Sequence, residues 1–393
     1  MTSEIGLAEI PVATGIRSRY VDDINGLRIH LLEAGFETSG RPCLVLLHGF
    51  PELGFSWRKV LPTLAAAGYH VIAPDQRGYG RTTGWDPSYD GHMAPFRLTN
   101  LVRDTLGLVA ALGYRSVDAV IGHDFGSLVA AWCALIRPDV FRSVALMSAP
   151  FAGPPPLPFN TVCGPAASAP TTSIFRELAG LARPRKHYQW YYSTREANDD
   201  MRFAPQGVHD FLRAYFHHKS ADWQGNQPFP LRSWSAIELA KLPTYYVMDL
   251  DETMAATAAQ EMPAPEIIAA NKWLPDDELA IYSAEFTRTG FQGALQWYRC
   301  ATSGAFTAEL QTWSGRTIDV PSCFIAGKHD WGIYQQPGAY EAMQTTVCTA
   351  FAGSHLVAGA GHWVQQEQPA AVTDALLSFL RDTRTGDRPE PTH

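Results

Sequence analysis

The sequence predicts an α/β protein with a mostly parallel, doubly wound sheet and a helical insertion within the chain. Short apolar runs typical of buried strands alternate with helical patterns through the first 150 residues. The alternation stops after a proline-rich stretch at residues 150–156 and resumes near residue 322. This interruption indicates one discontinuous core, at residues 1–150 and 305–393, that encloses a helical cap at residues 151–304.

The first part of the core contains repeated β-α units. Alternating or continuous apolar residues predict strands at residues 27–32, 43–48, 71–74, 117–121 and 143–147. Apolar residues at helical spacing predict helices at residues 56–68, 98–113 and 127–136. Parallel strands need crossover connections, so this strict alternation favours a parallel sheet covered by helices.

The second part of the core repeats the pattern after the insertion. Strands are predicted at residues 322–326 and 355–358, and helices at residues 340–347 and 370–381. The last residues, 383–393, are polar and contain two prolines, so we expect them to be disordered.

The composition indicates a globular protein and argues against several classes of partner. Hydrophobic residues make up 46% of the 393 residues and charged residues 18%, as in chains that bury a core. The net charge of −8 comes without a long basic run, so we expect no nucleic-acid partner. No stretch reaches the length of a membrane span, and the N-terminus lacks a signal-peptide pattern. We therefore expect a cytoplasmic protein with no membrane partner.

The six cysteines are scattered without metal-like spacing. Cys43, Cys133 and Cys323 lie in apolar strand or helix patterns, where buried free thiols are expected. Such thiols fit a reducing compartment. His329 stands beside Asp330 without a second cluster of ligands, so we expect no metal site.

A carboxylate stands where a strand-turn-helix motif often carries a nucleophilic serine. Residues 122–127 read Gly-His-Asp-Phe-Gly-Ser after an apolar run, which matches the nucleophile elbow G-x-S-x-G except at Asp124. A serine adds to acyl carbons, whereas an ionised carboxylate can displace a leaving group from an sp³ carbon. Asp124 therefore predicts an enzyme that opens C–O or C–halogen bonds through an alkyl ester.

Two further polar residues follow the later strands in the order that this chemistry requires. Asp330 comes after the strand at residues 322–326, and His362 comes after the strand at residues 355–358. The carboxyl ends of parallel strands lie at one edge of a sheet, so both residues can meet Asp124 there. We expect His362 to be the general base and Asp330 to orient it.

The loop His-Gly-Phe-Pro at residues 48–51 follows a predicted core strand and is placed to stabilise an oxyanion. The expected donors are the backbone N–H groups of Phe50 and Phe125. His48 and His123 flank the site, and we interpret them as structural hydrogen-bonding residues. The turn at residues 75–82 is expected to support the loop.

These motifs, His-Gly-Phe-Pro-Glu at residues 48–52 and Gly-His-Asp-Phe-Gly at residues 122–126, resemble the epoxide hydrolases of the α/β-hydrolase fold. The resemblance runs from about residue 17 to 383. It implies that the insertion is a helical cap carrying two tyrosines, which match Tyr188 and Tyr298. Tyr191 and Tyr192 compete for the first of these roles, and Tyr191 would share a helix face with Tyr188.

The resemblance also implies a reaction, the opening of an oxirane to a vicinal diol. Its substrates would be a small apolar epoxide and water. The cap tyrosines would donate to the oxirane oxygen while Asp124 attacks a ring carbon. Water activated by His362 and Asp330 would then hydrolyse the ester. No metal or organic cofactor is needed.

The aromatic residues of the insertion fit either a packed helical core or an apolar lid over a pocket. The walls of such a pocket are expected to include His48, Pro51, Trp190, Trp297, Trp331 and Trp363. Residues 240–275 look longer than the corresponding part of the family's cap, and we expect them to affect the pocket's shape. A homodimer is compatible with the sequence.

Two other functions stay open. A haloalkane or haloacid dehalogenase uses the same aspartate ester, but Phe125 offers no side-chain donor for a halide where those enzymes commonly have tryptophan. A non-catalytic ligand-binding protein would keep the pocket without turnover. A serine esterase is disfavoured because Ser127 is out of register with the elbow.

Overall fold

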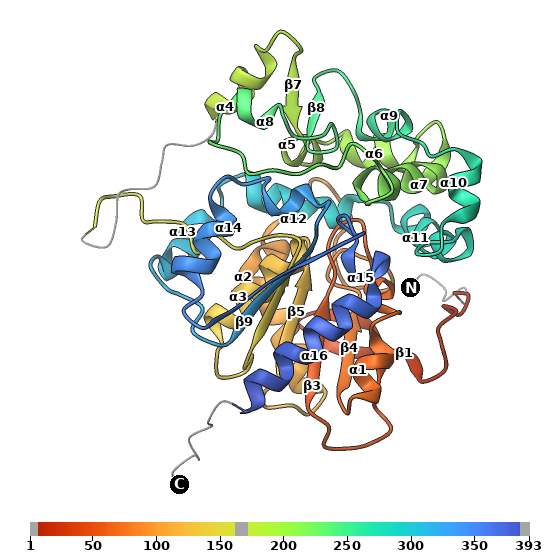
Figure 1. The fold of residues 1–393 in the computed structure, drawn as a ribbon, viewed down its shortest axis with the longest axis vertical. Helices are drawn as coiled ribbons and strands as arrows, with labels where there is room; N and C mark the ends of the chain where they lie inside the picture. The colour runs from red at the N-terminus through yellow and green to blue at the C-terminus, as the bar shows by residue number, and fades with distance from the viewer. Residues whose placement is uncertain (1–6, 162–171, 386–393) are drawn as a thin grey trace.

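The computed structural model describes residues 7–161 and 172–385, and Figure 1 shows a central sheet with helices against it and further helices above one end. The expectations for the first six residues and for residues 386–393 fall outside the described part of the chain. The strands of the main sheet are β1 Ile16–Ile24, β2 Leu27–Ala34, β3 Cys43–Leu47, β4 His70–Pro74, β5 Ala119–His123, β6 Val144–Met147, β9 Ser322–Gly327 and β10 Phe351–Val357.

The sheet confirms the predicted mostly parallel architecture. Its order is β1-β2-β4-β3-β5-β6-β9-β10. All pairs from β4 to β10 are parallel, and only β1 with β2 and β2 with β4 are antiparallel. The sequence did not indicate β1, because this edge strand is largely polar and lacks a clear apolar alternation.

The register of the central strands aligns their carboxyl ends. Leu47 in β3 pairs with Gly122 in β5, and Met147 in β6 pairs with both His123 in β5 and Ile325 in β9. Residues that follow these strands therefore leave the sheet at the same edge, where the candidate site lies.

The helices of the core pack against the sheet and against one another. They include α1 Leu61–Ala66, α2 Leu98–Ala111, α3 Phe125–Ile136, α14 Ala339–Ala342, α15 Val364–Glu367 and α16 Pro369–Thr385. α2 packs against α3, and α1 packs against α16. Because α16 continues to Thr385, the expectation of disorder was wrong for residues 383–385.

Two predicted helices differ in the structure. Residues 56–68 do not form one helix: Gly54–Trp57 form a 3₁₀ turn and α1 begins only at Leu61. Pro62 has no N–H to donate to the carbonyl four residues earlier, so a continuous helix would lose a hydrogen bond there. The helix expected at residues 340–347 changes into a π-helical turn at Met343–Val347.

The insertion between β6 and β9 forms a separate group of elements above the carboxyl edge of the sheet (Figure 1). It comprises α4 Thr172–Ala179, β7 Arg185–His187, α5 Tyr188–Tyr192, α6 Ala197–Arg202, α7 Gly207–Lys219, α8 Ala236–Leu239, β8 Val247–Asp249, α9 Met254–Ala259, α10 Pro265–Ala270, α11 Asp276–Thr289 and α12 Gln292–Thr302. The short helix α13 Thr307–Leu310 follows in the second part of the core. The long segment at residues 240–275 supplies β8, which pairs with β7, and the helices α9 and α10.

The apolar interior spans the sheet and the cap. Cys43, Cys133 and Cys323 are buried and unpaired, which confirms their prediction as buried free thiols. Within residues 7–161 and 172–385, no helix has the length and apolar character needed to cross a membrane.

Candidate active site

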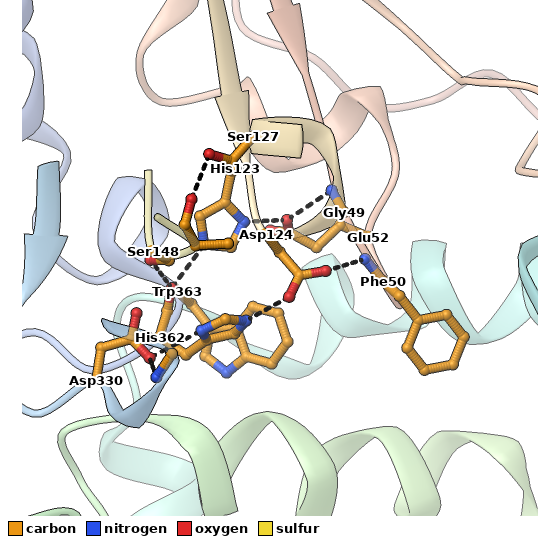
Figure 2. A network of polar contacts seen from close by, with 12 residues as sticks. Gly49, Phe50, Glu52, His123, Asp124, Ser127, Ser148, Asp330, His362 and Trp363 are labelled. Carbon is orange, nitrogen blue, oxygen red and sulfur yellow. Dashed lines mark hydrogen bonds and ion pairs between the residues drawn. The ribbon is translucent and has the colours of Figure 1, made fainter. Parts of the chain in front are cut away.

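Asp124 lies at a sharp turn between β5 and α3. Its backbone has φ 54° and ψ −123°, a conformation that is rare for a residue with a side chain. A Cβ on Gly122 would lie 2.0 Å from the Gly126 carbonyl oxygen, and one on Gly126 would lie 2.4 Å from that of Leu47. Close backbone approach therefore requires both glycines of the motif, and the turn presents Asp124 at the edge of the sheet (Figure 2).

Asp124 is held between a backbone donor and an imidazole. Its Oδ1 accepts the N–H of Phe50 at 3.0 Å, and its Oδ2 lies 3.1 Å from Nε2 of His362. On the other side of the ring, Oδ1 of Asp330 lies 3.0 Å from Nδ1 of His362. The fold thus brings together the three side chains that the sequence places after separate strands (Figure 2).

The carboxylates of this group are ionised in spite of their burial. Burial alone would raise the pKa of Asp124, but the hydrogen bond and charge of His362, with the charges of Lys219 and His123, lower it below its ordinary value. The pKa of Asp330 is lowered in the same way, as His362 outweighs the effect of burial. Both groups are therefore negatively charged at neutral pH.

The loop that carries His362 is fixed by its backbone. The N–H of His362 donates to the carbonyl of Lys219 at 2.9 Å, and the His362 carbonyl accepts Nε2–H of His123 at 2.7 Å. The carboxyl group of Glu367, whose pKa burial raises to about 8, accepts the N–H groups of the residues on either side of His362, at 2.9 and 3.0 Å. The ring is thereby oriented by both the core and the cap.

A second buried ion pair involves His123, the residue before Asp124. Nδ1 of His123 lies 2.6 Å from Oε2 of Glu52, and both side chains are 0% exposed. The two partners of the His123 ring, a carboxylate and a carbonyl, only accept hydrogen bonds, so both ring nitrogens donate and the ring is an imidazolium. Burial opposes this state, but Glu52 raises the pKa of His123 above its ordinary value.

Sequence reasoning gave His123 a structural role and gave Glu52 none. The available signal was the place of Glu52 at the end of the His-Gly-Phe-Pro-Glu motif. Its other oxygen accepts amide N–H groups from Gln365 and Gln366, each at 2.9 Å.

The loop at residues 48–51 is held in place by hydrogen bonds of its first residue, His48. His48 is 0% exposed; its Nδ1 donates to the Gly49 carbonyl at 2.9 Å, and its Nε2 accepts the N–H of Gln76 at 3.1 Å. His48 therefore supports the loop from a buried position, and its place in a pocket wall stays a prediction. Phe125, the other expected donor, is the first residue of α3, so its N–H has no acceptor within the helix.

Two tyrosines of the cap lie over this loop. Tyr188 begins α5 and Tyr298 lies in α12, and their ring centroids are 5.9 Å apart. The Tyr298 ring lies 5.7 Å from that of Phe50 and 5.4 Å from that of Phe125. Burial, followed by the charge of Asp124, raises the pKa of both phenols well above 10, so both keep their protons at neutral pH.

Tyr191 points to a different part of the cap. Its hydroxyl donates to Oδ2 of Asp200 at 2.8 Å. Burial and this carboxylate raise its pKa, whereas the charge that affects the Tyr188 phenol is that of Asp124. The geometry therefore favours Tyr188 over Tyr191 as the partner of Tyr298.

Two of the expected pocket tryptophans use their N–H groups within the protein. Nε1 of Trp297 donates to the Arg77 carbonyl at 2.9 Å, and Nε1 of Trp363 donates to the Phe216 carbonyl at 2.8 Å. These indoles can form apolar walls but have no free donor for a ligand. The other expected wall residues lie in the oxyanion loop, in α5 and directly after Asp330: Pro51, Trp190 and Trp331.

Known proteins similar to this chain agree on one activity. The family described as alpha/beta hydrolase fold matches residues 42–173. Epoxide hydrolase A of Mycobacterium tuberculosis is 34% identical, covering 91% of this chain and 95% of its own length. An epoxide hydrolase of Caballeronia sordidicola is 31% identical over 97% of this chain and 96% of its own.

Solved structures give the same picture. An epoxide hydrolase from an endophytic Streptomyces superposes with a TM-score of 0.76 at 30% identity, covering 95% of this chain and 97% of its own. Epoxide hydrolase A from Mycobacterium thermoresistibile has a TM-score of 0.69 at 33% identity, covering 93% and 98%.

Proposed function

The chain belongs to the epoxide hydrolases of the α/β-hydrolase fold, and we propose that it converts an oxirane to a vicinal diol through a covalent ester on Asp124. The observation that carries this mechanism is the position of the Asp124 carboxylate, 3.0 Å from the Phe50 N–H and 3.1 Å from Nε2 of His362. The aromatic surroundings of Asp124 favour a small apolar epoxide, with water as the second substrate.

The first half of the reaction forms the ester. Oδ1 of Asp124 accepts the Phe50 N–H, as the carbonyl oxygen of the ester would, so Oδ2, which lies beside Nε2 of His362, is the oxygen that attacks a ring carbon. The C–O bond of the oxirane breaks, and a phenol of Tyr188 or Tyr298 gives its proton to the oxygen that leaves. The negative charge moves from Asp124 to the phenolate.

The charge on Asp124 also affects the acidity of the phenols that donate this proton. In the resting enzyme it contributes to the raised pKa of both phenols. Esterification removes that charge, so the phenols become stronger acids at the moment when the alkoxide needs a proton. The nucleophile and the acid are thereby coupled.

The second half hydrolyses the ester. Water attacks the carboxyl carbon of Asp124 while His362, oriented by Asp330, takes one proton. The N–H groups of Phe50 and Phe125 stabilise the oxyanion, and its collapse expels the alkoxide, which takes the proton from His362. The remaining water proton, on the carboxyl group of Asp124, restores the phenol.

A single turnover in ¹⁸O water with enzyme in excess over an epoxide tests the ester. The diol should carry no label, because its new oxygen comes from Asp124, and the label should instead appear in the protein. Label in the diol from this first turnover would mean that water attacks the ring directly.

Two variants separate the steps. His362→Gln should accumulate the ester, seen as an increase in protein mass equal to that of the epoxide. Asp124→Asn should abolish the adduct. Absence of the adduct in His362→Gln, in a folded protein that binds the epoxide, would contradict the mechanism.

Halide release and ligand binding distinguish the two competing functions. A dehalogenase would release halide from haloalkanes faster than it opens epoxides. Trp297, whose ring lies 5.1 Å from that of Phe125, already donates its indole N–H to a carbonyl. A non-catalytic binding protein would bind ligand equally after Asp124→Ala and form no diol from any epoxide.

A further inference from the structure

The hydroxyl group of Tyr188 lies between two glutamine amides. It donates to Oε1 of Gln335 at 3.2 Å and accepts Nε2–H of Gln189 at 3.2 Å. The hydroxyl group of Tyr298 forms no hydrogen bond with any residue in the described part of the chain. The two cap phenols therefore differ in their polar surroundings, although both are buried and the charge of Asp124 acts on both.

Tyr188 and Gln189 are consecutive residues at the start of α5 in the cap. The N–H of Tyr188 donates to the Tyr246 carbonyl at 2.9 Å, and the Gln189 carbonyl accepts the hydroxyl of Ser193 at 2.7 Å. Hydrogen bonds thus fix the backbone of both residues, and this backbone carries the Gln189 amide to the phenol oxygen.

Gln335 reaches the same phenol from the core. It lies two residues after the 3₁₀ turn Trp331–Ile333, which directly follows Asp330. The N–H of Gly332 in this turn donates to Oδ1 of Asp330 at 2.7 Å, and a Cβ on Gly332 would lie 2.5 Å from the Ser148 carbonyl oxygen. Close packing therefore fixes the turn, and Gln335 links the loop that carries Asp330 to the cap.

The hydrogen bond from Gln189 distinguishes Tyr188 from Tyr298 as an acid. A phenol that gives up its proton leaves a buried negative charge, which is unfavourable unless hydrogen bonds stabilise it. Burial and the charge of Asp124 raise the pKa of Tyr188, whereas the hydrogen bond from Gln189 lowers it. For Tyr298, burial, Asp124 and an ionised Tyr188 all raise the pKa, so the two phenols do not lose their protons together.

Gln335 can form a hydrogen bond with the phenol in both of its protonation states. A terminal amide carries an acceptor and donors at the same end of the side chain, and its last torsion is roughly two-fold. In the resting enzyme Oε1 accepts the hydroxyl proton of Tyr188. After that proton has left, rotation of the amide exchanges the two atoms, and Nε2 donates to the phenolate. An ionised carboxylate in this position can only accept.

We propose that Tyr188 transfers its proton to the oxirane oxygen, and that Gln189 and Gln335 are positioning residues that stabilise its phenolate. Tyr298 donates a hydrogen bond to the same oxygen and keeps its proton. The inference rests on the ester mechanism proposed above. Oδ2 of Asp124 forms the bond to the ring carbon, and the electron pair of the broken C–O bond takes the Tyr188 proton. The negative charge moves from Asp124 to the phenolate, which regains a proton when the ester is hydrolysed.

The test measures ester formation in the His362→Gln background, where the ester accumulates. The enzyme is mixed with a saturating aryl-substituted epoxide, quenched over time and weighed by mass spectrometry. Gln335→Met removes the donor and the acceptor of the amide with little change in volume. It should slow ester formation by about 10–100-fold, because a hydrogen bond to a charged group is lost. Gln189→Met should slow it in the same range.

The effect of Gln335→Met should depend on which tyrosine is present. In a Tyr298→Phe background the further loss should stay at about 10–100-fold. In a Tyr188→Phe background it should fall below about 2-fold, because no phenolate forms beside Gln335. A purely structural role of Gln335 would slow both backgrounds equally.

Two variants complete the test. Gln336→Met is the matched control, because Gln336 is the next residue of the same loop and is exposed. It should leave the rate of the His362→Gln parent unchanged. Gln335→Glu keeps the acceptor but has no N–H group. At about pH 8, well above the ordinary pKa of a carboxyl group, it should react as slowly as Gln335→Met.

Two results would overturn the inference: an equal loss from Gln335→Met in both tyrosine backgrounds, or the parent rate in Gln335→Glu. If Gln335→Met does not fold, Gln335→Leu replaces it. Failure of the ester mechanism itself has a different signature, since the His362→Gln parent would then form no adduct.

Discussion

Glu52→Gln is expected to destabilise the protein by about 3–5 kcal/mol, because it leaves the His123 imidazolium buried without a counter-charge. The two groups are 2.6 Å apart and 0% exposed. Charges about 4 Å apart at an effective dielectric constant of about 20 interact by about 4 kcal/mol, which agrees with that range. Glutamine has a single acceptor oxygen, so it cannot accept both from His123 and from the amide N–H groups that Oε1 now accepts.

A double-mutant cycle tests this value by urea unfolding of wild type, Glu52→Gln, His123→Gln and the double variant. The double variant has no unpaired charge, so its loss should be smaller than the sum of the single losses by at least about 2 kcal/mol. Asp139→Asn, at the exposed pair with Arg137, is the control and should cost at most about 1 kcal/mol. Additive losses, within about 0.5 kcal/mol, would refute the reasoning.

Three further predictions concern the acids, the pH dependence and the elbow. Tyr188→Phe and Tyr298→Phe should slow ester formation by about 10²–10⁴-fold in rapid-quench assays, and Tyr191→Phe should barely affect it; equal effects in all three would count against the assignment. The pKa of Asp75 is lowered to about 2, because its histidine partner outweighs the effect of burial. Ionised Asp75 therefore stabilises the folded state by about 2 kcal/mol above about pH 4, and this contribution is lost as the pH falls through about 2. In urea unfolding, Asp75→Asn should lower the free energy of unfolding by that amount at pH 7 and by little at pH 2. Gly126→Ala places a Cβ 2.4 Å from a carbonyl oxygen and should cost about 1–3 kcal/mol together with most of the activity, whereas wild-type turnover and melting temperature would contradict the steric argument.

Sequence patterns predicted the parts of this protein that depend on local chain geometry. The apolar run before residue 122 and the two glycines beside Asp124 predicted β5, the elbow and α3, because this turn requires those residue types within a few positions. Local patterns failed where a single residue changes the backbone. Pro62 divides the region expected to form one helix at residues 56–68.

Sequence patterns did not predict the contacts between distant segments. Tyr188 and Tyr191 share one helix, but the Tyr191 hydroxyl donates to Asp200 whereas the Tyr188 hydroxyl donates to Gln335 at 3.2 Å. The charge of Asp124 acts on the Tyr188 phenol. The charge of His123 follows from its two acceptors, Glu52 and the carbonyl of His362, which lie 71 and 239 residues away along the chain. Neither arrangement leaves a periodic pattern.

The amino-acid sequence alone determined the α/β architecture and the order of nucleophile, acid and base, because strands of one parallel sheet deliver whatever follows them to a common edge. Only the tertiary structure decided which buried charges surround that group and which phenol faces it. Those features depend on the packing of the cap on the core, where side chains far apart in the chain are buried together without solvent.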